Sequence, residues 1–261
     1  MDHFQLSDYN VEFWEKSNQF LVLVRGSRYY SKILATAFAD KSMSSSFRDN
    51  SDMYDWGLFL RNVKKREIDV VKDFLALLHE VVCLQDDLTQ CYALAYHKHQ
   101  LGRTEIGDLV HAAKPYSRPV TQQHKEHGAV LSKHFIDFIQ RHPTYRTADL
   151  LMSVPAIANK KFDLPSFIVG HVLDQVNLLD GRGFVEKTRT TKPIKDCTPQ
   201  EKTEILQDVF VVNDVTAIKG KKIILLDDIY LSGVTMNTVA SVLINAGAAQ
   251  VLGLVATKAG R

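Results

Sequence analysis

KKIILLDDIYLSGVTMNTVASVLINAG, residues 221–247, is the stretch on which the interpretation of this chain depends. Residues 222–226, in which a lysine is followed by four aliphatic residues, predict a buried strand, and residues 236–246 predict a helix that is ended by a glycine. Two acids, Asp227 and Asp228, and a short loop lie between the strand and the helix. This succession of strand, loop and helix is typical of a parallel α/β sheet.

The flanking segments repeat the same order from about residue 91 onward. Strands are predicted at 91–96, 148–154, from 184, at 209–212 and at 250–257, and helices at 104–113, 128–141, 167–178 and 198–208. The last of these helices begins with Thr198-Pro199-Gln200-Glu201, which favours a capping box with proline at the first helical position. We therefore expect an α/β fold with a parallel sheet and helices on both of its faces.

Residues 1–90 have a different pattern and carry no motif with a known chemistry. Residues 30–40 predict a helix, residues 41–55 are rich in serine and aspartate and predict a loop, and residues 67–84 carry apolar residues at helical spacing. We expect a mixed or mainly helical N-terminal region at 1–90, followed by a second domain at 91–261.

The composition is that of a globular protein and narrows the classes of function. The chain has 261 residues and a formal net charge of +2, which gives no general argument for binding nucleic acid or an anionic membrane. No apolar run is long enough to span a bilayer, and the N-terminus lacks the pattern of a secretory signal. Three scattered cysteines are too few for a disulfide framework, so we expect a cytoplasmic protein.

The loop after the two acids has the composition of an anion-binding site. It leads directly into a helix, whose first backbone N–H groups and dipole favour a negative charge. Gly233 allows a tight turn and a close approach of the backbone to a ligand, and Ser232 and Thr235 add hydroxyl donors. Ligands of open α/β sheets bind at the carboxyl ends of the strands, so this loop is suited to hold a phosphate group.

Asp227 and Asp228 are themselves poor ligands for phosphate, because both carry a negative charge. They suit the hydroxyl groups of a sugar attached to the phosphate, or a divalent metal ion that offsets their charge. A phosphate on one side and a diol on the other describe a ribose 5-phosphate group. The alternative is a solvated loop, and the Ser-Gly-x-Thr sequence before a helix favours the phosphate site over it.

Residues 227–235, Asp-Asp-Ile-Tyr-Leu-Ser-Gly-Val-Thr, resemble the motif with which type I phosphoribosyltransferases bind phosphoribosyl pyrophosphate (PRPP). The resemblance implies that Asp227 and Asp228 hold the ribose hydroxyls and are the candidate Mg²⁺ ligands. It assigns the 5′-phosphate to the loop, namely Leu231, Ser232, Gly233, Val234 and Thr235. Leu231 stands where many relatives have threonine or an acid, so it supplies no catalytic carboxylate.

Weaker similarities extend over residues 91–261 and favour the ComF-like branch of that family. Residues 105–114 are similar to the helix and lysine that open the domain. The implied pyrophosphate loop comprises Pro155, Ala156, Ile157, Ala158, Asn159 and Lys160. The implied flexible loop carries Lys187, Arg189, Lys192 and Lys195, for which a solvated surface loop is an equal alternative. The arginine-rich run and the zinc module of ComF proteins are absent from this sequence.

The resemblance implies a phosphoribosyltransferase of nucleotide metabolism that uses PRPP and Mg²⁺, transfers the phosphoribosyl group to an unidentified acceptor and releases pyrophosphate. Two alternatives stay open. One is a regulator that binds PRPP or a nucleotide and acts on a macromolecular partner through residues 1–90. The other is an enzyme that cleaves the glycosidic bond of a nucleotide or nucleoside. Homodimers are common in the family, and neither a membrane nor nucleic acid is indicated as a partner.

Overall fold

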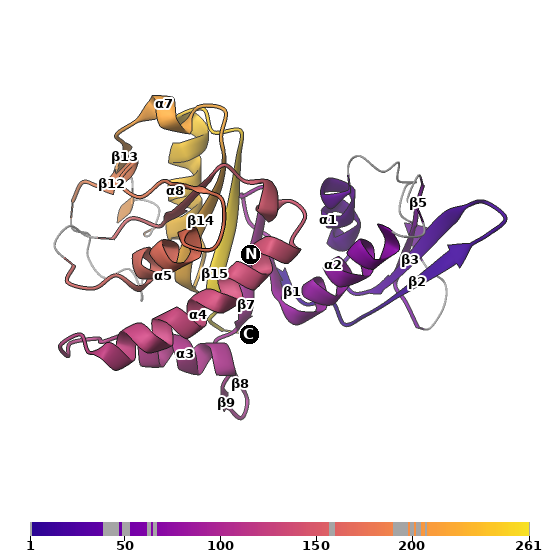
Figure 1. Ribbon diagram of the computed structural model, residues 1–261, viewed down its shortest axis with the longest axis horizontal. Coiled ribbons are helices and arrows are strands. Elements are labelled where there is room, and N and C mark those ends of the chain that lie inside the picture. Colours follow the sequence, from indigo (N-terminus) through magenta and orange to yellow (C-terminus); the bar gives the residue numbers. More distant parts are fainter. Residues whose placement is uncertain are drawn as a thin grey trace. The chain divides into compact units, whose positions relative to one another are not determined.

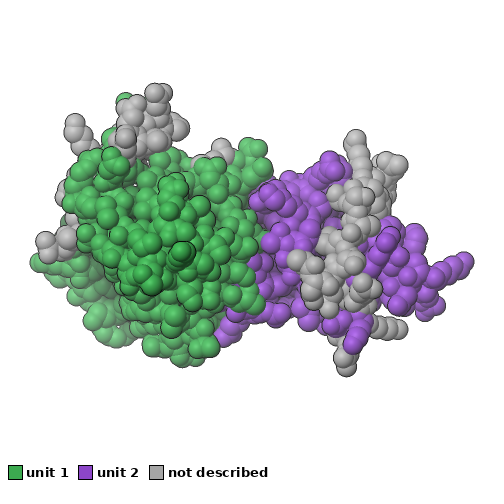
Figure 2. All heavy atoms as spheres, turned by 90° about the horizontal axis from the view of Figure 1, so that it is seen from above, with its two compact units in different colours: residues 1–2, 84–137, 147–261 green, residues 3–83, 138–146 purple. Residues whose placement is uncertain are grey.

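The structure is a computed structural model that describes residues 2–38, 47–48, 53–61, 64, 67–156, 160–189, 198, 201, 205–206 and 208–260. These residues divide into two units, which Figure 2 shows in green and purple. Unit 1 comprises residues 1–2, 84–137 and 147–261, and unit 2 comprises residues 3–83 and 138–146. Unit 2 is therefore built from two segments that are far apart in the sequence.

Unit 1 is built on a parallel sheet (Figure 1). Its strands are β7 (Gln90–Tyr96), β8 (Lys98–His99), β9 (Gly102–Arg103), β10 (Leu150–Ser153), β11 (Leu179–Asp180), β12 (Val185–Lys187), β13 (Phe210–Val212), β14 (Lys222–Tyr230) and β15 (Gln250–Lys258). β7, β15, β14, β10 and β11 are neighbours in that order, and each neighbouring pair is parallel. Two short antiparallel ribbons, β8 with β9 and β12 with β13, lie outside this sheet.

Helices cover the parallel sheet. Their bounds are α3 (Glu105–Ala113), α4 (Gln122–Arg141), α5 (Leu164–Leu173), α7 (Val215–Ile218) and α8 (Val234–Asn245). The last residues of α4, from Phe138, and most of the following 3₁₀ turn η2 (Tyr145–Thr147) belong to unit 2. α3 packs against β7 and β15, α5 against β10 and β14, and α8 against β14 and β15. The α/β fold expected from the sequence is confirmed. No helix in the described ranges combines the length and the apolar character needed to cross a bilayer.

β14 illustrates why a parallel sheet of this kind has an apolar core on both faces. Residues 223–226 are all fully buried, so the side chains that point to either face meet apolar neighbours. Next to β14, Gly253 of β15 lies so close to Cys91 and Met236 that an added Cβ would be 2.5 Å from the Cys91 sulfur. Glycine at this position allows α8, which carries Met236, to pack closely on the sheet.

Unit 2 contains an antiparallel sheet and helices packed with it. Its elements are β1 (His3–Phe4), β2 (Asp8–Trp14), β3 (Gln19–Arg25), α1 (Tyr29–Ala37), β4 (Phe47–Arg48), β5 (Trp56–Leu60), α2 (Ile68–Glu80) and β6 (Val82–Leu84). β2, β3, β5 and β4 are neighbours in that order, and each pair is antiparallel. The N-terminal region is therefore mixed rather than mainly helical.

Several elements end at residues other than those expected. The helix predicted at 67–84 ends at Glu80, and residues 82–84 form a strand instead. The helix predicted from residue 128 already begins at Gln122, in a polar segment that has no apolar periodicity. The loop predicted at 41–55 lies mostly outside the described residues, and its described part includes the short strand β4.

Candidate functional site

The carboxyl end of β14 extends beyond its neighbour β10. β10 pairs with β14 only as far as Ser153 with Leu226, whereas β15 pairs with it as far as Lys258 with Tyr230. The prediction that the strand ends at Leu226 was therefore wrong, because β15 supplies partners for Asp227, Ile229 and Tyr230. Asp227 and Asp228 lie within the strand rather than in a loop, and an extended backbone holds both acids.

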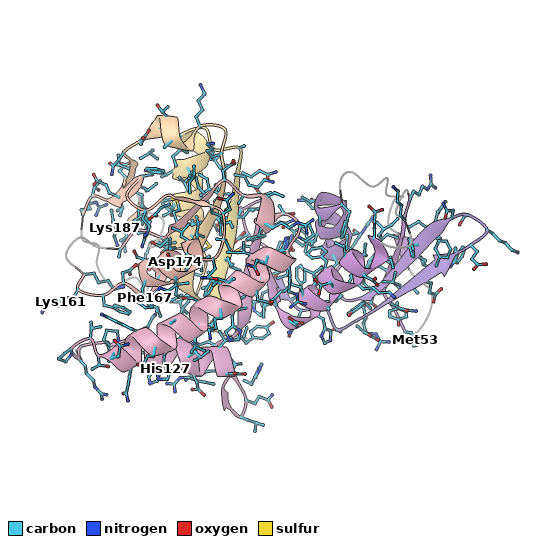
Figure 3. The ribbon with its side chains drawn as sticks, in the orientation of Figure 1. Met53, His127, Lys161, Phe167, Asp174 and Lys187 are labelled. Carbon is cyan, nitrogen blue, oxygen red and sulfur yellow. The ribbon has the colours of Figure 1, made fainter. Side chains whose placement is uncertain are left out.

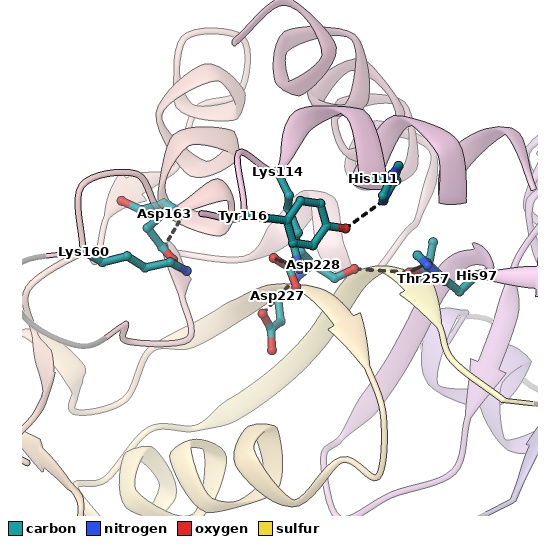
Figure 4. A network of polar contacts seen from close by, with 10 residues as sticks. His97, His111, Lys114, Tyr116, Lys160, Asp163, Asp227, Asp228 and Thr257 are labelled. Carbon is teal, nitrogen blue, oxygen red and sulfur yellow. Dashed lines mark hydrogen bonds and ion pairs between the residues drawn. The ribbon is translucent and has the colours of Figure 1, made fainter. Parts of the chain in front are cut away.

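The two acids leave the strand in opposite directions, as consecutive residues of a strand must. Asp227 lines a pocket together with the loop that follows it. Asp228 forms an ion pair with Lys114, in which Nζ lies 2.8 Å from Oδ2. Figure 4 shows both carboxylates and Lys114 at this end of the sheet. The acids therefore have different surroundings, although they are adjacent in the sequence.

The surroundings of Asp227 disfavour the charged form of its carboxyl group. Burial, followed by the charge of Asp228, raises the pKa of Asp227 well above its usual range. The Asp228 N–H, which donates to Asp227 Oδ1 at 2.8 Å, and the more distant Lys114 oppose this shift. A carboxyl group in this state would be stabilised in its charged form by a hydroxyl donor or a cation.

Lys114 reaches Asp228 from the end of α3. It is the C-cap residue of this helix, where the backbone becomes extended. Shortly after it, Tyr116 has a φ of 51°, a left-handed conformation that is uncommon for a residue with a Cβ. The Tyr116 hydroxyl lies 2.8 Å from Nδ1 of His111 on the same helix (Figure 4). Residues 114–116 are thus held at Asp228 and at His111.

The loop between β14 and α8 forms an open pocket, which we call the loop pocket. Gly233 precedes α8 with a φ of 75°, a left-handed conformation that favours glycine. The pocket is lined by Asp227 and residues 229–236. Every residue predicted to bind the 5′-phosphate, 231–235, is among them. Since Asp227 is the one charged member of this lining, an anion would be held here by N–H and hydroxyl groups.

Asp86 and Lys258, which lie outside the loop pocket, contact the start of its loop. The Tyr230 hydroxyl donates to Oδ2 of Asp86 at 3.0 Å, and burial raises the pKa of Asp86. The ammonium group of Lys258 donates to the carbonyl oxygen of Leu231 at 3.3 Å. Sequence reasoning missed both supports. For Lys258 a signal existed, because the residue ends a strand that is parallel to β14.

A second pocket, the strand-end pocket, lies at the carboxyl end of β10. It is open to solvent. From the predicted pyrophosphate loop it contains Pro155, Ala156 and Lys160, and from the predicted flexible loop it contains Lys187. The structure therefore brings these two predicted segments together, although more than 25 residues separate them in the sequence.

The cations of the strand-end pocket already have partners. Lys160 pairs with Asp163 at 2.7 Å, and the Asp163 side chain also caps α5. Arg182, which sequence reasoning missed, donates to the Asp180 carboxylate and, at 3.0 Å, to the Ser166 carbonyl oxygen. This pairing holds the pKa of Asp180 below its usual range. An anion entering the pocket would share or replace these partners.

The ribbon of β12 and β13 pairs Lys187, the first residue of the predicted flexible loop, with the strand that follows the helix predicted at 198–208. Lys187 of β12 is paired with Phe210 of β13, and its ammonium lies 6.0 Å from the centre of the Phe210 ring. Burial, followed by the charge of Arg189, lowers the pKa of Lys187. Arg189 itself donates to the Ile205 carbonyl oxygen at 3.2 Å. Figure 3 labels Lys187 in this part of unit 1.

Part of the predicted site lies outside the described residues, namely Ile157, Ala158, Asn159, Lys192 and Lys195.

The capping box predicted for Thr198 and Glu201 is confirmed. Glu201 Oε2 accepts from the Thr198 N–H at 2.7 Å, and the Thr198 hydroxyl oxygen accepts from the Glu201 N–H at 3.3 Å.

Comparison with known proteins agrees with the position of the loop pocket. Residues 173–259 match the model of the phosphoribosyl transferase domain. The matched segment runs from the last residue of α5 through β15 and contains Asp227, Asp228 and the loop 231–235. The ComF-like branch stays a prediction. No curated protein matches the chain.

Among solved structures, the chain is similar to the allosteric regulatory enzyme of purine biosynthesis, with a TM-score of 0.37 and 11% identity. It is also similar to glutamine PRPP amidotransferase from B. subtilis in complex with ADP and GMP, with a TM-score of 0.34 and 12% identity. Each similarity covers 91% of this chain, and 44% and 46% of the respective relatives. The chain thus spans less than half the length of these two proteins.

Proposed function

We propose that unit 1 binds PRPP together with Mg²⁺ and transfers its phosphoribosyl group to an acceptor, releasing pyrophosphate. One observation carries the proposal: a single pocket combines Asp227, the left-handed Gly233 and the start of α8, within a segment that matches the phosphoribosyl transferase domain. A carboxylate beside an N–H cradle fits a ribose that carries a phosphate.

In this proposal each end of the ligand has its own part of unit 1. The 5′-phosphate accepts hydrogen bonds from the N–H and hydroxyl groups of loop 231–235, and Gly233 leaves room for it. A ribose hydroxyl donates to Asp227 and thereby favours the charged form of that acid. The pyrophosphate group lies toward the strand-end pocket, where Lys160, Arg182 and Lys187 offer positive charge.

The residues present fit Mg²⁺ only if the ion arrives with its substrate. Within the described part of the chain, no group of three or more His, Cys, Asp or Glu side chains could hold a metal ion. Asp227 and Asp228 offer carboxylate oxygens, and Mg²⁺ takes its remaining oxygen ligands from phosphates and water. Bound in this way, the ion would stabilise the charge that grows on departing pyrophosphate.

The proposed reaction is a displacement at C1 of the ribose. The acceptor atom forms a bond to C1, and the bond between C1 and the pyrophosphate oxygen breaks, so that the electron pair leaves with pyrophosphate. The residues of unit 1 contribute by position and charge: loop 231–235 and Asp227 fix the sugar, and the strand-end cations stabilise the leaving group. The acceptor is not specified by these residues.

Calorimetric titration of PRPP, with and without Mg²⁺, tests the proposal. Wild-type protein is expected to bind PRPP only with the metal, and the double variant Asp227→Asn/Asp228→Asn is expected not to bind it. A double variant of two exposed acids of unit 1, Glu105→Gln/Glu126→Gln, removes the same number of carboxyl groups and is expected to bind normally. Folded wild-type protein that does not bind PRPP would falsify the proposal.

A second candidate function is a regulator that binds PRPP or a nucleotide without turnover. It is favoured by the ion pair of Lys114 with Asp228, because an acid expected to hold the ribose already has a cationic partner. Release of pyrophosphate with any nitrogenous or hydroxyl acceptor distinguishes the two functions. Binding of PRPP without pyrophosphate release across a broad acceptor panel would favour the regulator.

A further inference from the structure

Lys258 is a buried cation whose ammonium group contacts the backbone of the loop pocket. It is the last residue of β15, which lies between β14 and β7, and only 8% of it is exposed. Its ammonium group donates to two carbonyl oxygens, those of Leu231 and Ala259. The Ala259 N–H donates to the Tyr230 carbonyl oxygen at 2.9 Å, so the backbone on both sides of this contact is fixed.

The charge of Lys258 has no carboxylate partner in the described part of the chain. Its hydrogen bonds end on neutral carbonyl groups, and burial lowers its pKa without an opposing acid. A buried and unpaired ammonium group is costly, and such groups are normally paired. A lysine in this state, next to a loop suited to bind an anion, is compensated when the anion is bound.

The contact with Leu231 also has a geometric consequence. The Leu231 carbonyl and the Ser232 N–H belong to one planar trans peptide unit, so they point in opposite directions. Because Lys258 holds the carbonyl oxygen on its own side, the Ser232 N–H faces away from Lys258. Ser232 lines the loop pocket, so this orientation selects which side of the peptide can donate there.

We propose that Lys258 is a positioning residue of the loop pocket, which orients the 231–232 peptide and supplies the positive charge that a bound 5′-phosphate compensates. This inference rests on the proposed function and deepens it, because it adds a residue from outside the motif to the phosphate site. A lysine that served only to hold β15 in the sheet would affect stability and would not distinguish one ligand group from another.

Lys258→Met tests the inference, since methionine retains the length of the side chain and removes its charge. Lys222→Met is the matched control, because Lys222 begins the neighbouring strand β14 at its opposite end and lies outside both pockets. Binding of PRPP with Mg²⁺, and of pyrophosphate with Mg²⁺, is measured by calorimetry for wild type and both variants. The melting temperature of each ligand-free protein is measured in parallel.

The expected result is an affinity of Lys258→Met for PRPP that is about tenfold to hundredfold lower than that of wild type. Its affinity for pyrophosphate is expected to match that of Lys222→Met, and its melting temperature is expected to be no lower than that of wild type, because a costly buried charge is removed. An unchanged affinity for PRPP, an equal loss for both ligands, or a variant that does not fold would each overturn the inference. Wild-type protein that binds no PRPP would contradict the proposed function itself. Wild-type protein that binds PRPP, together with a Lys258→Met variant of unchanged affinity, would leave the proposed function intact and contradict only the role of Lys258.

Discussion

Unit 1 gathers its partly buried charged groups at the carboxyl ends of strands, whereas unit 2 buries His142 inside a shell of aromatic rings. His142 is fully buried, and the centres of the Phe74, Phe138 and Tyr145 rings lie 4.6–5.2 Å from that of its imidazole. Burial lowers the pKa of His142 to about 3, so the ring is neutral. In unit 1, by contrast, burial raises the pKa of Asp227 to about 8, and among the described residues the Lys258 ammonium donates only to neutral carbonyl oxygens.

His142 thus has a packing role in unit 2, whereas Asp227 and Lys258 of unit 1 would be stabilised further by a bound ligand. A neutral histidine among aromatic rings contributes contact area and accepts one hydrogen bond, from the Thr144 N–H at 3.2 Å. Charges at strand ends cost stability, which a ligand can restore. Changes in unit 1 should therefore alter ligand affinity more than stability, and changes around His142 should do the reverse.

The largest effect is expected from Gly233→Ala. A Cβ at a φ of 75° is strained and would crowd the phosphate, so the affinity for PRPP should fall roughly 100-fold. Gly220→Ala is the control, because Gly220 has a similar φ of 73°, nothing lies within 4 Å of its added Cβ, and it lies outside both pockets. Calorimetry measures the affinity for PRPP, which should fall only for Gly233→Ala. Denaturant titration should show similar losses of stability, about 1–2 kcal/mol, for both variants. Equal affinities would remove Gly233 from the site.

His142 provides the corresponding prediction for unit 2. Its folded-state pKa of about 3 lies below the ordinary value of 6.5, so the unfolded chain binds more protons between these values. The contribution to stability is complete above pH 6.5 and is lost as the pH falls toward 3, by up to about 1.4 kcal/mol per pH unit. His142→Phe should remove this slope, whereas the exposed His79→Gln should retain it.

The measurement for His142 can be confined to unit 2. Both tryptophans of the chain, Trp14 and Trp56, belong to that unit, so the intrinsic fluorescence in a denaturant titration reports on its unfolding. Titrations between pH 4 and pH 8 give the slope for each variant. A wild-type stability that does not change over this range would contradict a buried neutral His142.

A smaller effect on binding is expected in the strand-end pocket. Lys187→Gln removes a partly buried cation from its lining, and the affinity for pyrophosphate with Mg²⁺ should fall about tenfold. Lys161→Gln, next to the pocket but not in its lining, should leave that affinity unchanged. Calorimetry compares the two variants. If both lose affinity equally, the effect is one of general charge rather than of this pocket.

The smallest effect is expected from Tyr230→Phe. The change removes the hydroxyl that donates to Asp86 and should lower the free energy of unfolding of unit 1 by about 1 kcal/mol. Hydrogen exchange of the β14 amides measures this loss, since unit 1 contains no tryptophan. The affinity for PRPP should change less than threefold. A tenfold loss would show that the Asp86 contact is part of the binding site.

The sequence was informative wherever local physical chemistry determines the structure. An aliphatic run followed by acids and a glycine-containing loop predicted β14, Gly233 and α8 in the right order, because each depends on neighbouring residues. The parallel sheet followed from the alternation of strands and helices. The strand-end position of Asp227 and Asp228 followed from the same alternation.

What the sequence did not reveal depends on residues that are distant along the chain. β14 continues to Tyr230 only because β15 pairs with it, and no local pattern shows this. The same holds for Lys114 at Asp228, where the two residues are more than 100 positions apart. The first turns of α4 were missed for another reason, because a polar, largely exposed segment has no apolar periodicity to detect.

The two-segment composition of unit 2 has a consequence for how the protein is synthesised and divided. His142 and its neighbours at 138–146 join residues 3–83 only after more than fifty intervening residues have been translated. The aromatic shell around His142 therefore cannot close on a nascent chain that ends at residue 90. A protease that cuts there would separate Phe74 from Phe138 and Tyr145 and leave an incomplete core on each fragment.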